Sequence, residues 1–175
     1  MSFRITRRIE IDAGHRIMTH GSKCRNLHGH RYVVEAECES SSVRSDGEQT
    51  DMVLDFGFLK EEMLTAIDHP CDHGFIAAAA DREVLEMYAP KDSDPAVWAE
   101  ALAARAEAEG GVLAANTRSA LKLYVVPFQP TAERLAKHWF ECLAEPVRIR
   151  SQGLARLVAV KVWETPNCEA EYRPA

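Results

Sequence analysis

The chain has 175 residues, of which 46% are hydrophobic and 27% charged, and its formal net charge is −6. This composition fits one globular domain with an ordinary core and excludes disorder of the whole chain. The net negative charge argues against a nucleic-acid partner. Because no run of about 18 apolar residues occurs, a transmembrane helix and a membrane partner are not expected.

The cysteines do not suggest a disulfide framework. There are five, an odd number, and they are scattered along the chain. The N-terminal segment, MSFRITRRIEID, lacks the apolar stretch of a signal peptide. We therefore expect a cytoplasmic protein with reduced thiols.

Two strands are expected at the N-terminal end. Residues 3–13 alternate between apolar and polar side chains, which predicts a half-buried strand, and the apolar parity continues to His15. A second alternating segment runs from about residue 30 to 39, and His28 and His30 share the parity of its buried face. The two strands should pair as neighbours.

The middle of the chain is predicted to be mainly helical. Asp55 is a suitable N-cap for an amphipathic helix, which should end before Pro70. An alanine-rich helix is expected over residues 95–110, where a Gly-Gly pair stops it. A short strand is expected over 121–126, and Thr131 should cap a further helix.

The C-terminal part again reads as strands. Val158, Val160 and Val162 share one face, and Glu164 continues their parity. A Thr-Pro-Asn turn leads into a second alternating segment that starts at Cys168. The order of two strands, helices and two strands predicts an α+β fold with antiparallel hairpins at both ends, in a single domain over residues 1–175.

Three histidines form the strongest candidate site. His28 and His30 are two apart on a strand and project to the same side, with Gly29 between them to admit close approach. His15 ends the preceding strand on the matching face and can supply a third nitrogen. Three imidazoles with an open fourth position are the pattern of catalytic zinc. The alternative is a set of buried histidines that are only hydrogen-bonded.

Cys24 lies four residues before His28 and has two interpretations. It can be a fourth ligand in a closed, structural zinc site. It can also be a thiolate base or nucleophile beside the metal, because nearby cations lower the pKa of a thiol. The spacing does not decide between these two roles.

Carboxylates supply further candidates. Two Asp-His pairs lie close together, Asp68-His69 and Asp72-His73, and an aspartate that orients a histidine makes a proton-transfer pair. The alternative, which a lone pair favours, is that these residues cap the end of the preceding helix and face water. Glu164 is unusual because a carboxylate rarely continues an apolar strand face. It suggests a buried acceptor for a ligand rich in donors, and the alternative is a strand end that meets solvent.

Together these pieces resemble one family. The stretches are IDAGHRI, CRNLHGHRYVVE, MVLDFGFLK, CDHGFI, PTAERLAKHWFECL and VKVWETPNCEAEY, in the family's order. The chain resembles the 6-pyruvoyl-tetrahydropterin synthase / 6-carboxy-tetrahydropterin synthase (QueD) family. The resemblance implies a T-fold, whose subunits join their sheets into a barrel, and a homo-oligomer with active sites at subunit interfaces.

The resemblance also implies roles for individual residues. It makes His15, His28 and His30 the zinc ligands and Cys24 the catalytic thiolate. An Asp-His pair would complete a proton relay. Glu164 would hold the pterin ring through its N–H groups, and Glu133 would lie near the pterin site. CDHGFI fits the family motif better than IDHPCD, which favours Asp72-His73 over Asp68-His69.

The spacing within the family points to one reaction. Three residues separate Cys24 from the His-Gly-His motif, as in the carboxy synthases of queuosine biosynthesis. The implied reaction converts 7,8-dihydroneopterin triphosphate to 6-carboxy-tetrahydropterin, acetaldehyde and triphosphate. A 6-pyruvoyl-tetrahydropterin synthase and a non-catalytic pterin-binding paralogue with a structural zinc are the alternatives. The segment from about 77 to 128 is atypical of the compact family pattern and is interpreted as an insertion.

Overall fold

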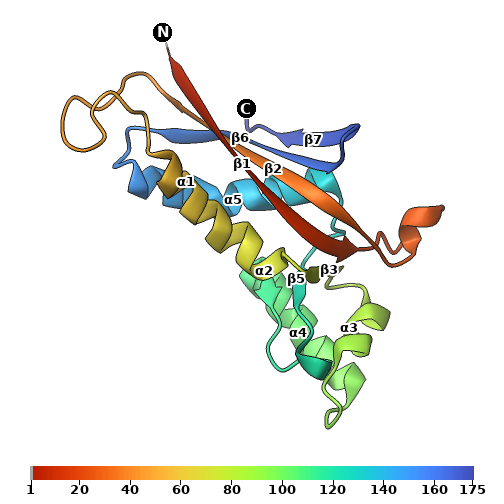
Figure 1. The fold of residues 1–175 in the computed structure, drawn as a ribbon. Helices are drawn as coiled ribbons and strands as arrows, with labels where there is room; N and C mark the ends of the chain where they lie inside the picture. The colour runs from red at the N-terminus through yellow and green to blue at the C-terminus, as the bar shows by residue number, and fades with distance from the viewer. Residues whose placement is uncertain (1) are drawn as a thin grey trace.

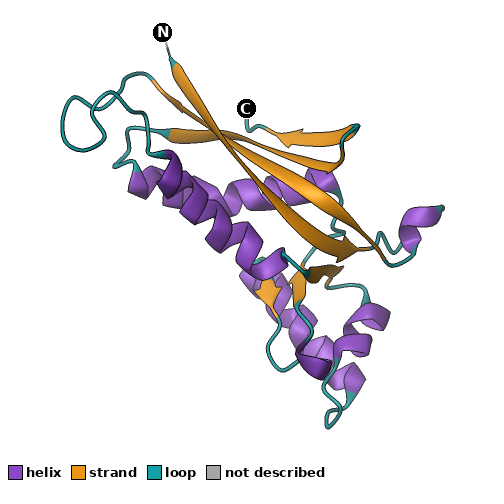
Figure 2. Ribbon diagram, viewed as in Figure 1, coloured by secondary structure: helices purple, strands orange, loops and turns teal. Residues whose placement is uncertain are grey.

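The structure is a computed structural model in which residues 2–175 are described. They form a seven-stranded sheet in the order β4-β5-β3-β1-β2-β6-β7. Helices α1 and α5 pack against one face of the long strands, while α3 and α4 lie beside the short strands β3 and β5 (Figures 1 and 2). The predicted α+β class is therefore confirmed.

The N-terminal hairpin consists of β1 (Phe3–His15) and β2 (His28–Ser40), which pair antiparallel. Both strands are longer at the connecting turn than the alternating segments, 3–13 and about 30–39, that predicted them. Their register places His15 opposite His28 and Ala13 opposite His30. This hairpin therefore sets the three predicted histidines at one end of the sheet.

The helix after Asp55 does not end before Pro70, which corrects the sequence prediction. Segment α1 (Phe56–Met63) continues through a π-helical turn, Leu64–Asp68, into α2 (His69–Cys71). In that turn the backbone N–H of His69 donates to the carbonyl of Leu64. The wider turn makes room for the proline ring, which would clash with a carbonyl in a regular α-helix.

The segment after α2 contains more strand than the sequence indicated. It forms β3 (Gly74–Ala78), α3 (Arg82–Tyr88), α4 (Pro95–Glu109), β4 (Val112–Leu113) and β5 (Leu123–Val126), with a 3-10 turn over Arg118–Ala120. Gly110 ends α4, as predicted, and it adopts the left-handed conformation (φ 79) that favours glycine. The strand β3 was missed because its apolar run, FIAAAA, does not alternate.

This segment has a hydrophobic cluster of its own. Leu85, Leu102 and Ala106 pack there with Val125, and all of them are buried. Strands β3 and β5 nevertheless extend the main sheet, since β3 pairs with residues Ala13 to His15 of β1. The segment is thus tied to the strand end that carries His15.

The C-terminal part matches the prediction. Thr131 caps α5 (Ala132–Arg150), and β6 (Arg156–Thr165) pairs with β7 (Cys168–Tyr172) as an antiparallel hairpin. The buried stripe of α5 faces the sheet and includes Leu135, Trp139 and Leu143. The start of α5 therefore lies beneath the histidine end of the β1–β2 hairpin.

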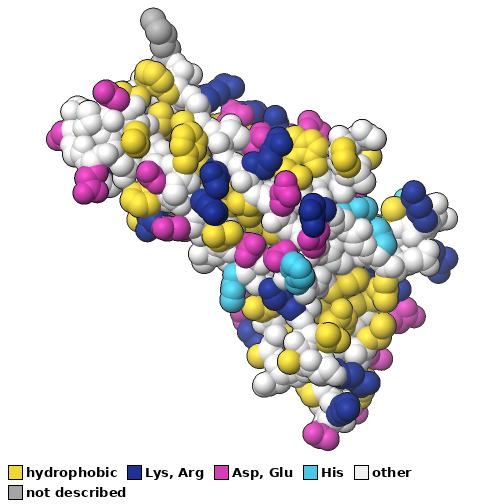
Figure 3. All heavy atoms as spheres, viewed as in Figure 1, with side chains coloured by type: hydrophobic (Ala, Val, Ile, Leu, Met, Phe, Trp, Pro, Cys, Tyr) yellow, Lys and Arg dark blue, Asp and Glu magenta, His cyan; other side chains and the backbone are white. Residues whose placement is uncertain are grey.

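The other face of the long strands carries charged side chains, and basic and acidic groups alternate across it (Figure 3). Cross-strand ion pairs join Arg4 to Glu39, Arg8 to Glu35 and Arg173 to Glu37.

Among residues 2–175, no helix has both the length and the apolar character that crossing a membrane requires.

One buried polar pair outside the candidate site makes stability depend on pH. His138 lies in α5, and its Nε2 is 2.8 Å from the hydroxyl of Tyr124. Burial lowers the pKa of His138, while Glu141 raises it and Arg134 lowers it further. The folded state therefore favours the neutral ring, and the stabilisation is present above the ordinary histidine pKa, about 6.5.

We expect the free energy of unfolding to fall as the pH drops from 7 to 5, because unfolding then lets His138 take up a proton. The fall should be smaller in the His138→Gln variant, whose other titrating groups are unchanged. Urea unfolding at several pH values measures both slopes. Equal slopes in the two proteins would contradict this account.

Candidate active site

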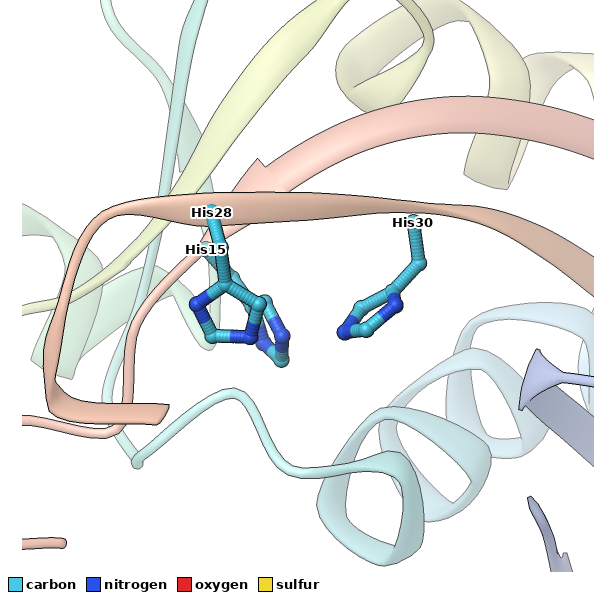
Figure 4. A group of neighbouring side chains, drawn as sticks. All are labelled: His15, His28 and His30. Carbon is cyan, nitrogen blue, oxygen red and sulfur yellow. The ribbon is translucent and has the colours of Figure 1, made fainter. Parts of the chain in front are cut away.

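The three predicted histidines meet at the end of the β1–β2 hairpin. Their candidate ligand nitrogens all lie within 4.8 Å of one another. The ring centroids are 4.6 Å apart for His15 and His28, and 5.1 Å from His30 to each of the others. Figure 4 shows the three imidazoles projecting from the same side of the hairpin toward a common point. The predicted cluster is therefore present.

Hydrogen bonds to two of the rings leave suitable nitrogens free. The Nδ1–H group of His15 donates to the carbonyl of Pro130, and that of His28 donates to the carbonyl of Asn26, each at 2.8 Å. In both rings Nε2 then carries the lone pair, the tautomer a metal ligand needs. The Nε2 atom of His15 is buried and has no hydrogen-bond partner within the described part of the chain. A buried nitrogen without a partner fits a bound cation.

The close approach of the two strands depends on Gly29. A Cβ atom added there would lie 2.9 Å from the carbonyl oxygen of Ala13, closer than real Cβ atoms come to backbone. Gly29 is paired with Gly14 across the hairpin. Any larger residue between the two histidines would push the strands apart at this point.

The environment favours the neutral form of two of the imidazoles, those of His15 and His30. Burial lowers the pKa of His15 to about 4. The hydrogen bond to the carbonyl of Pro130 raises this pKa, while the rings of His28 and His30 lower it further. Burial also lowers the pKa of His30, and His28 adds to the effect. Neutral imidazole is the form that coordinates metal, so protons compete little for this site near neutral pH.

A cavity of about 270 Å³ adjoins the cluster and brings together four of the predicted residues, His15, Cys24, Glu133 and Glu164. Cys24 is a free, partly exposed thiol in a short 3-10 turn, η1 (Lys23–Arg25). The two basic neighbours of Cys24 in this turn, Lys23 and Arg25, do not line the cavity.

Two carboxylates from different elements meet in the cavity. Glu164 comes from the end of β6 and Glu133 from the first turn of α5. Burial raises the pKa of Glu164 and the charge of Glu133 raises it further, while His28 lowers it. The Oε1 atom of Glu164 is 3.8 Å from Nε2 of His15. The cavity thus offers hydrogen-bond acceptors beside the histidine cluster.

Asp72 and His73 form a hydrogen-bonded pair at another place. Oδ2 of Asp72 accepts a hydrogen bond from Nδ1 of His73 at 2.7 Å, and its Oδ1 accepts one from the backbone N–H of Asp12 at 2.9 Å. His73 is exposed and adopts a left-handed conformation (φ 53), which costs a residue other than glycine about 1 kcal/mol. Neither residue lines the cavity of Cys24. Within one chain, the structure does not bring this pair to the thiol.

Asp68 and His69 differ from that pair. They occupy the end of the π-helical turn and the start of α2. In the described residues no hydrogen bond joins their side chains, and the backbone carbonyl of Asp68 instead accepts from the N–H of Asp72.

The sequence analysis missed some residues of the cavity. His20 and Cys168 line it, as does Thr131 at the start of α5. A single histidine in a loop gives no spacing signal, which explains why His20 was not selected. Outside the cavity, the sequence analysis also did not select Lys122. Its Nζ donates to the backbone carbonyl of Asp72 at 2.6 Å.

Comparison with known proteins identifies a family for the chain. The family model described as 6-pyruvoyl tetrahydropterin synthase matches residues 4–175. A protein of Rickettsia bellii named 6-carboxy-5,6,7,8-tetrahydropterin synthase is 32% identical over 168 residues, covering 96% of this chain and 98% of the relative. One of the same name from Aquifex aeolicus is 31% identical over 191 residues, covering 99% of each chain.

Solved structures share the fold. An uncharacterised protein from Wolinella succinogenes superposes with a TM-score of 0.69 at 23% identity, covering 100% of this chain and 99% of the other. The 6-pyruvoyl tetrahydropterin synthase of Caenorhabditis elegans gives 0.57 at 19% identity, covering 100% and 97%. At these identities the likeness concerns the fold alone.

The fold and the site thus define a T-fold protein with a three-histidine candidate metal centre. The chain belongs to the 6-pyruvoyl tetrahydropterin synthase family, which the full-length match and the curated relatives establish.

Proposed function

We propose that the protein is a zinc-dependent carbon–carbon lyase, a 6-carboxy-5,6,7,8-tetrahydropterin synthase. It would convert 7,8-dihydroneopterin triphosphate to 6-carboxy-tetrahydropterin, acetaldehyde and triphosphate, in queuosine biosynthesis. The observation that carries the proposal is the joint position of His15, Cys24 and Glu164 around one cavity. The names of the curated relatives support the carboxy reaction.

In this proposal His15, His28 and His30 hold the metal. Bound zinc would supply Lewis acidity toward the oxygens of the substrate side chain. The three-histidine set leaves a position free for substrate, as in catalytic zinc sites. Three imidazoles suit several divalent ions, so the proposed zinc rests on the ligand type and the family.

The other residues act on the substrate directly. Cys24, as thiolate, takes a proton from the side-chain carbon next to the ring. His73, oriented by Asp72, moves protons on and off the substrate oxygens. Glu164 accepts hydrogen bonds from N–H groups of the pterin ring, and Glu133 lies beside it to assist.

We further propose a homo-oligomer with active sites at the subunit interfaces. The Asp72-His73 pair lies outside the Cys24 cavity of its own chain, which is expected if subunits share a site. The sheet also has edges that another sheet can extend. Within residues 2–175, β7 is an outer strand, and β3 covers only the Ala13–His15 end of β1.

The reaction products test the proposal. The purified, zinc-loaded protein is mixed with 7,8-dihydroneopterin triphosphate in the presence of an acetaldehyde trap, and the products are identified by mass spectrometry. Carboxy-tetrahydropterin with trapped acetaldehyde supports the carboxy synthase. A pyruvoyl product without acetaldehyde would identify the alternative, a 6-pyruvoyl-tetrahydropterin synthase. Substrate binding without turnover would favour a non-catalytic paralogue with a structural zinc.

The Asp-His assignment can be tested with a matched pair of variants. We expect Asp72→Asn to lower kcat by about 10²- to 10⁴-fold, since an amide no longer favours the proton on Nδ1 of His73. KM should change little, because the pair is not proposed to bind the pterin ring. Asp68→Asn is the control and should stay within about twofold of wild type. The opposite ranking would assign the relay to Asp68-His69.

A further inference from the structure

Arg16 follows the metal-ligand candidate His15 directly and forms the tightest ion pair near the site. Its Nε and Nη2 atoms donate to the two carboxylate oxygens of Asp81 at 2.6 and 2.5 Å. The side chain of Asp81 is only 3% exposed and also accepts from the backbone N–H of Val84, at the start of α3. An Arg–carboxylate fork of this kind fixes both position and orientation.

The fork is connected to the Cys24 turn by the next residue. The backbone N–H of Ile17 donates to the carbonyl of Cys24 at 2.8 Å, and Ile17 also lines the cavity. Asp81, Arg16, Ile17 and Cys24 therefore form a continuous chain of contacts. It runs from the first turn of α3 to the residue that carries the proposed base.

A second contact holds the loop that leads from the end of β1 to the turn of Cys24. The side-chain amide of Gln129 donates to the hydroxyl of Thr19 at 2.6 Å. Gln129 precedes Pro130, whose carbonyl accepts from His15. The turn projects past the ends of β1 and β2, where Figure 1 shows it as the short orange-red helix at the right. A projecting turn needs such ties to hold one geometry.

The Arg16–Asp81 ion pair also connects the segment from 77 to 128 to the candidate site. Asp81 begins α3, whose Val84 and Leu85 are buried in the separate hydrophobic cluster. Packing of α3 in that cluster fixes the position of Asp81. A buried carboxylate needs a charged or hydrogen-bonding partner, and Arg16 supplies it. The segment thus reaches the active site through this ion pair.

We infer that Arg16 and Asp81 form a clamp that positions the Cys24 turn over the cavity, which makes Arg16 a positioning residue for the proposed reaction. The inference rests on the proposed function for its effect on turnover. Its effect on the thiol can be observed without any turnover. A misplacement of about 1 Å costs an enzyme on the order of 10²-fold in rate.

Two variants test the clamp. Arg16→Lys keeps a cation beside Asp81 but cannot make the bidentate hydrogen bonds of the guanidinium group. The double variant Arg16→Met/Asp81→Asn removes the pair without leaving a buried charge, and asparagine still caps α3. Alkylation of Cys24 by iodoacetamide is followed by peptide mass spectrometry, with Cys142, a partly buried thiol that does not line this cavity, as internal reference. Hydrogen exchange of the Ile17 amide, zinc content and thermal unfolding are measured alongside.

We expect Cys24 to be alkylated at least fivefold faster in the double variant, with faster exchange at Ile17 and unchanged zinc content. The kcat value should fall at least tenfold while KM changes less, and Arg16→Lys should lie between. Glu83→Gln is the matched control, because Glu83 contacts Arg16 but its side chain is 87% exposed. It should behave as wild type.

The outcomes separate the two proposals. Wild-type alkylation and exchange rates in a folded double variant would overturn the clamp, whatever the activity. Lack of turnover in wild type would reject the proposed function, and the alkylation and exchange rates would still decide on the clamp. A lower kcat with unchanged thiol and amide rates would also overturn it, because Arg16 would then act by another route.

Discussion

Replacement of Cys24 by alanine is expected to lower turnover by about 10²- to 10⁴-fold and to leave the zinc content unchanged. The reduction is that expected when a general base is lost. Zinc should remain because three imidazoles, without the thiol, form the cluster whose candidate ligand nitrogens lie within 4.8 Å of one another. Steady-state rates and metal analysis of the same preparation measure both quantities.

The control is Cys142→Ala, which removes a partly buried thiol of α5 that does not line the Cys24 cavity. Its rate should stay within about twofold of wild type. Joint loss of zinc and activity in Cys24→Ala would contradict the prediction and make Cys24 a fourth ligand. The site would then be closed and structural, which is the other role that the sequence left open.

The sequence predicted those parts of the fold whose patterns are periodic. The alternation over 3–13 and the stripe of α5 each identify an element with one buried face, and both elements are present. The segment after α2 was harder because β3 is apolar throughout and α3 is short. Pro70 misled the prediction because a π-helical turn accommodates it, and no local sequence signal indicates that turn.

The candidate site was predictable where its residues share one hairpin. Strand parity placed His15, His28 and His30 on one face, and the register confirms that His15 lies opposite His28. Contacts between distant segments gave no such signal. Pairing of Arg16 with Asp81 depends on how α3 packs beside the sheet, which periodicity does not encode.

The metal assignment leads to the other large effect. We expect His28→Ala to weaken zinc binding by more than about 100-fold, since loss of even an outer-shell partner costs 10- to 100-fold. His28 is the most suitable ligand to remove because it is half-buried, whereas His15 is 1% exposed and anchors Pro130. Competition with a chromogenic chelator measures the affinity, and turnover should be lost in parallel at limiting zinc.

His69→Ala is the matched control for zinc binding, because it removes an exposed imidazole outside the cluster. Its zinc affinity should equal that of wild type. Excess zinc should restore part of the turnover of His28→Ala but none of that of Cys24→Ala, since only the former lacks metal. If His28→Ala kept full zinc affinity, the metal would be held by other residues, and the three-histidine site would be a hydrogen-bonded cluster without a metal.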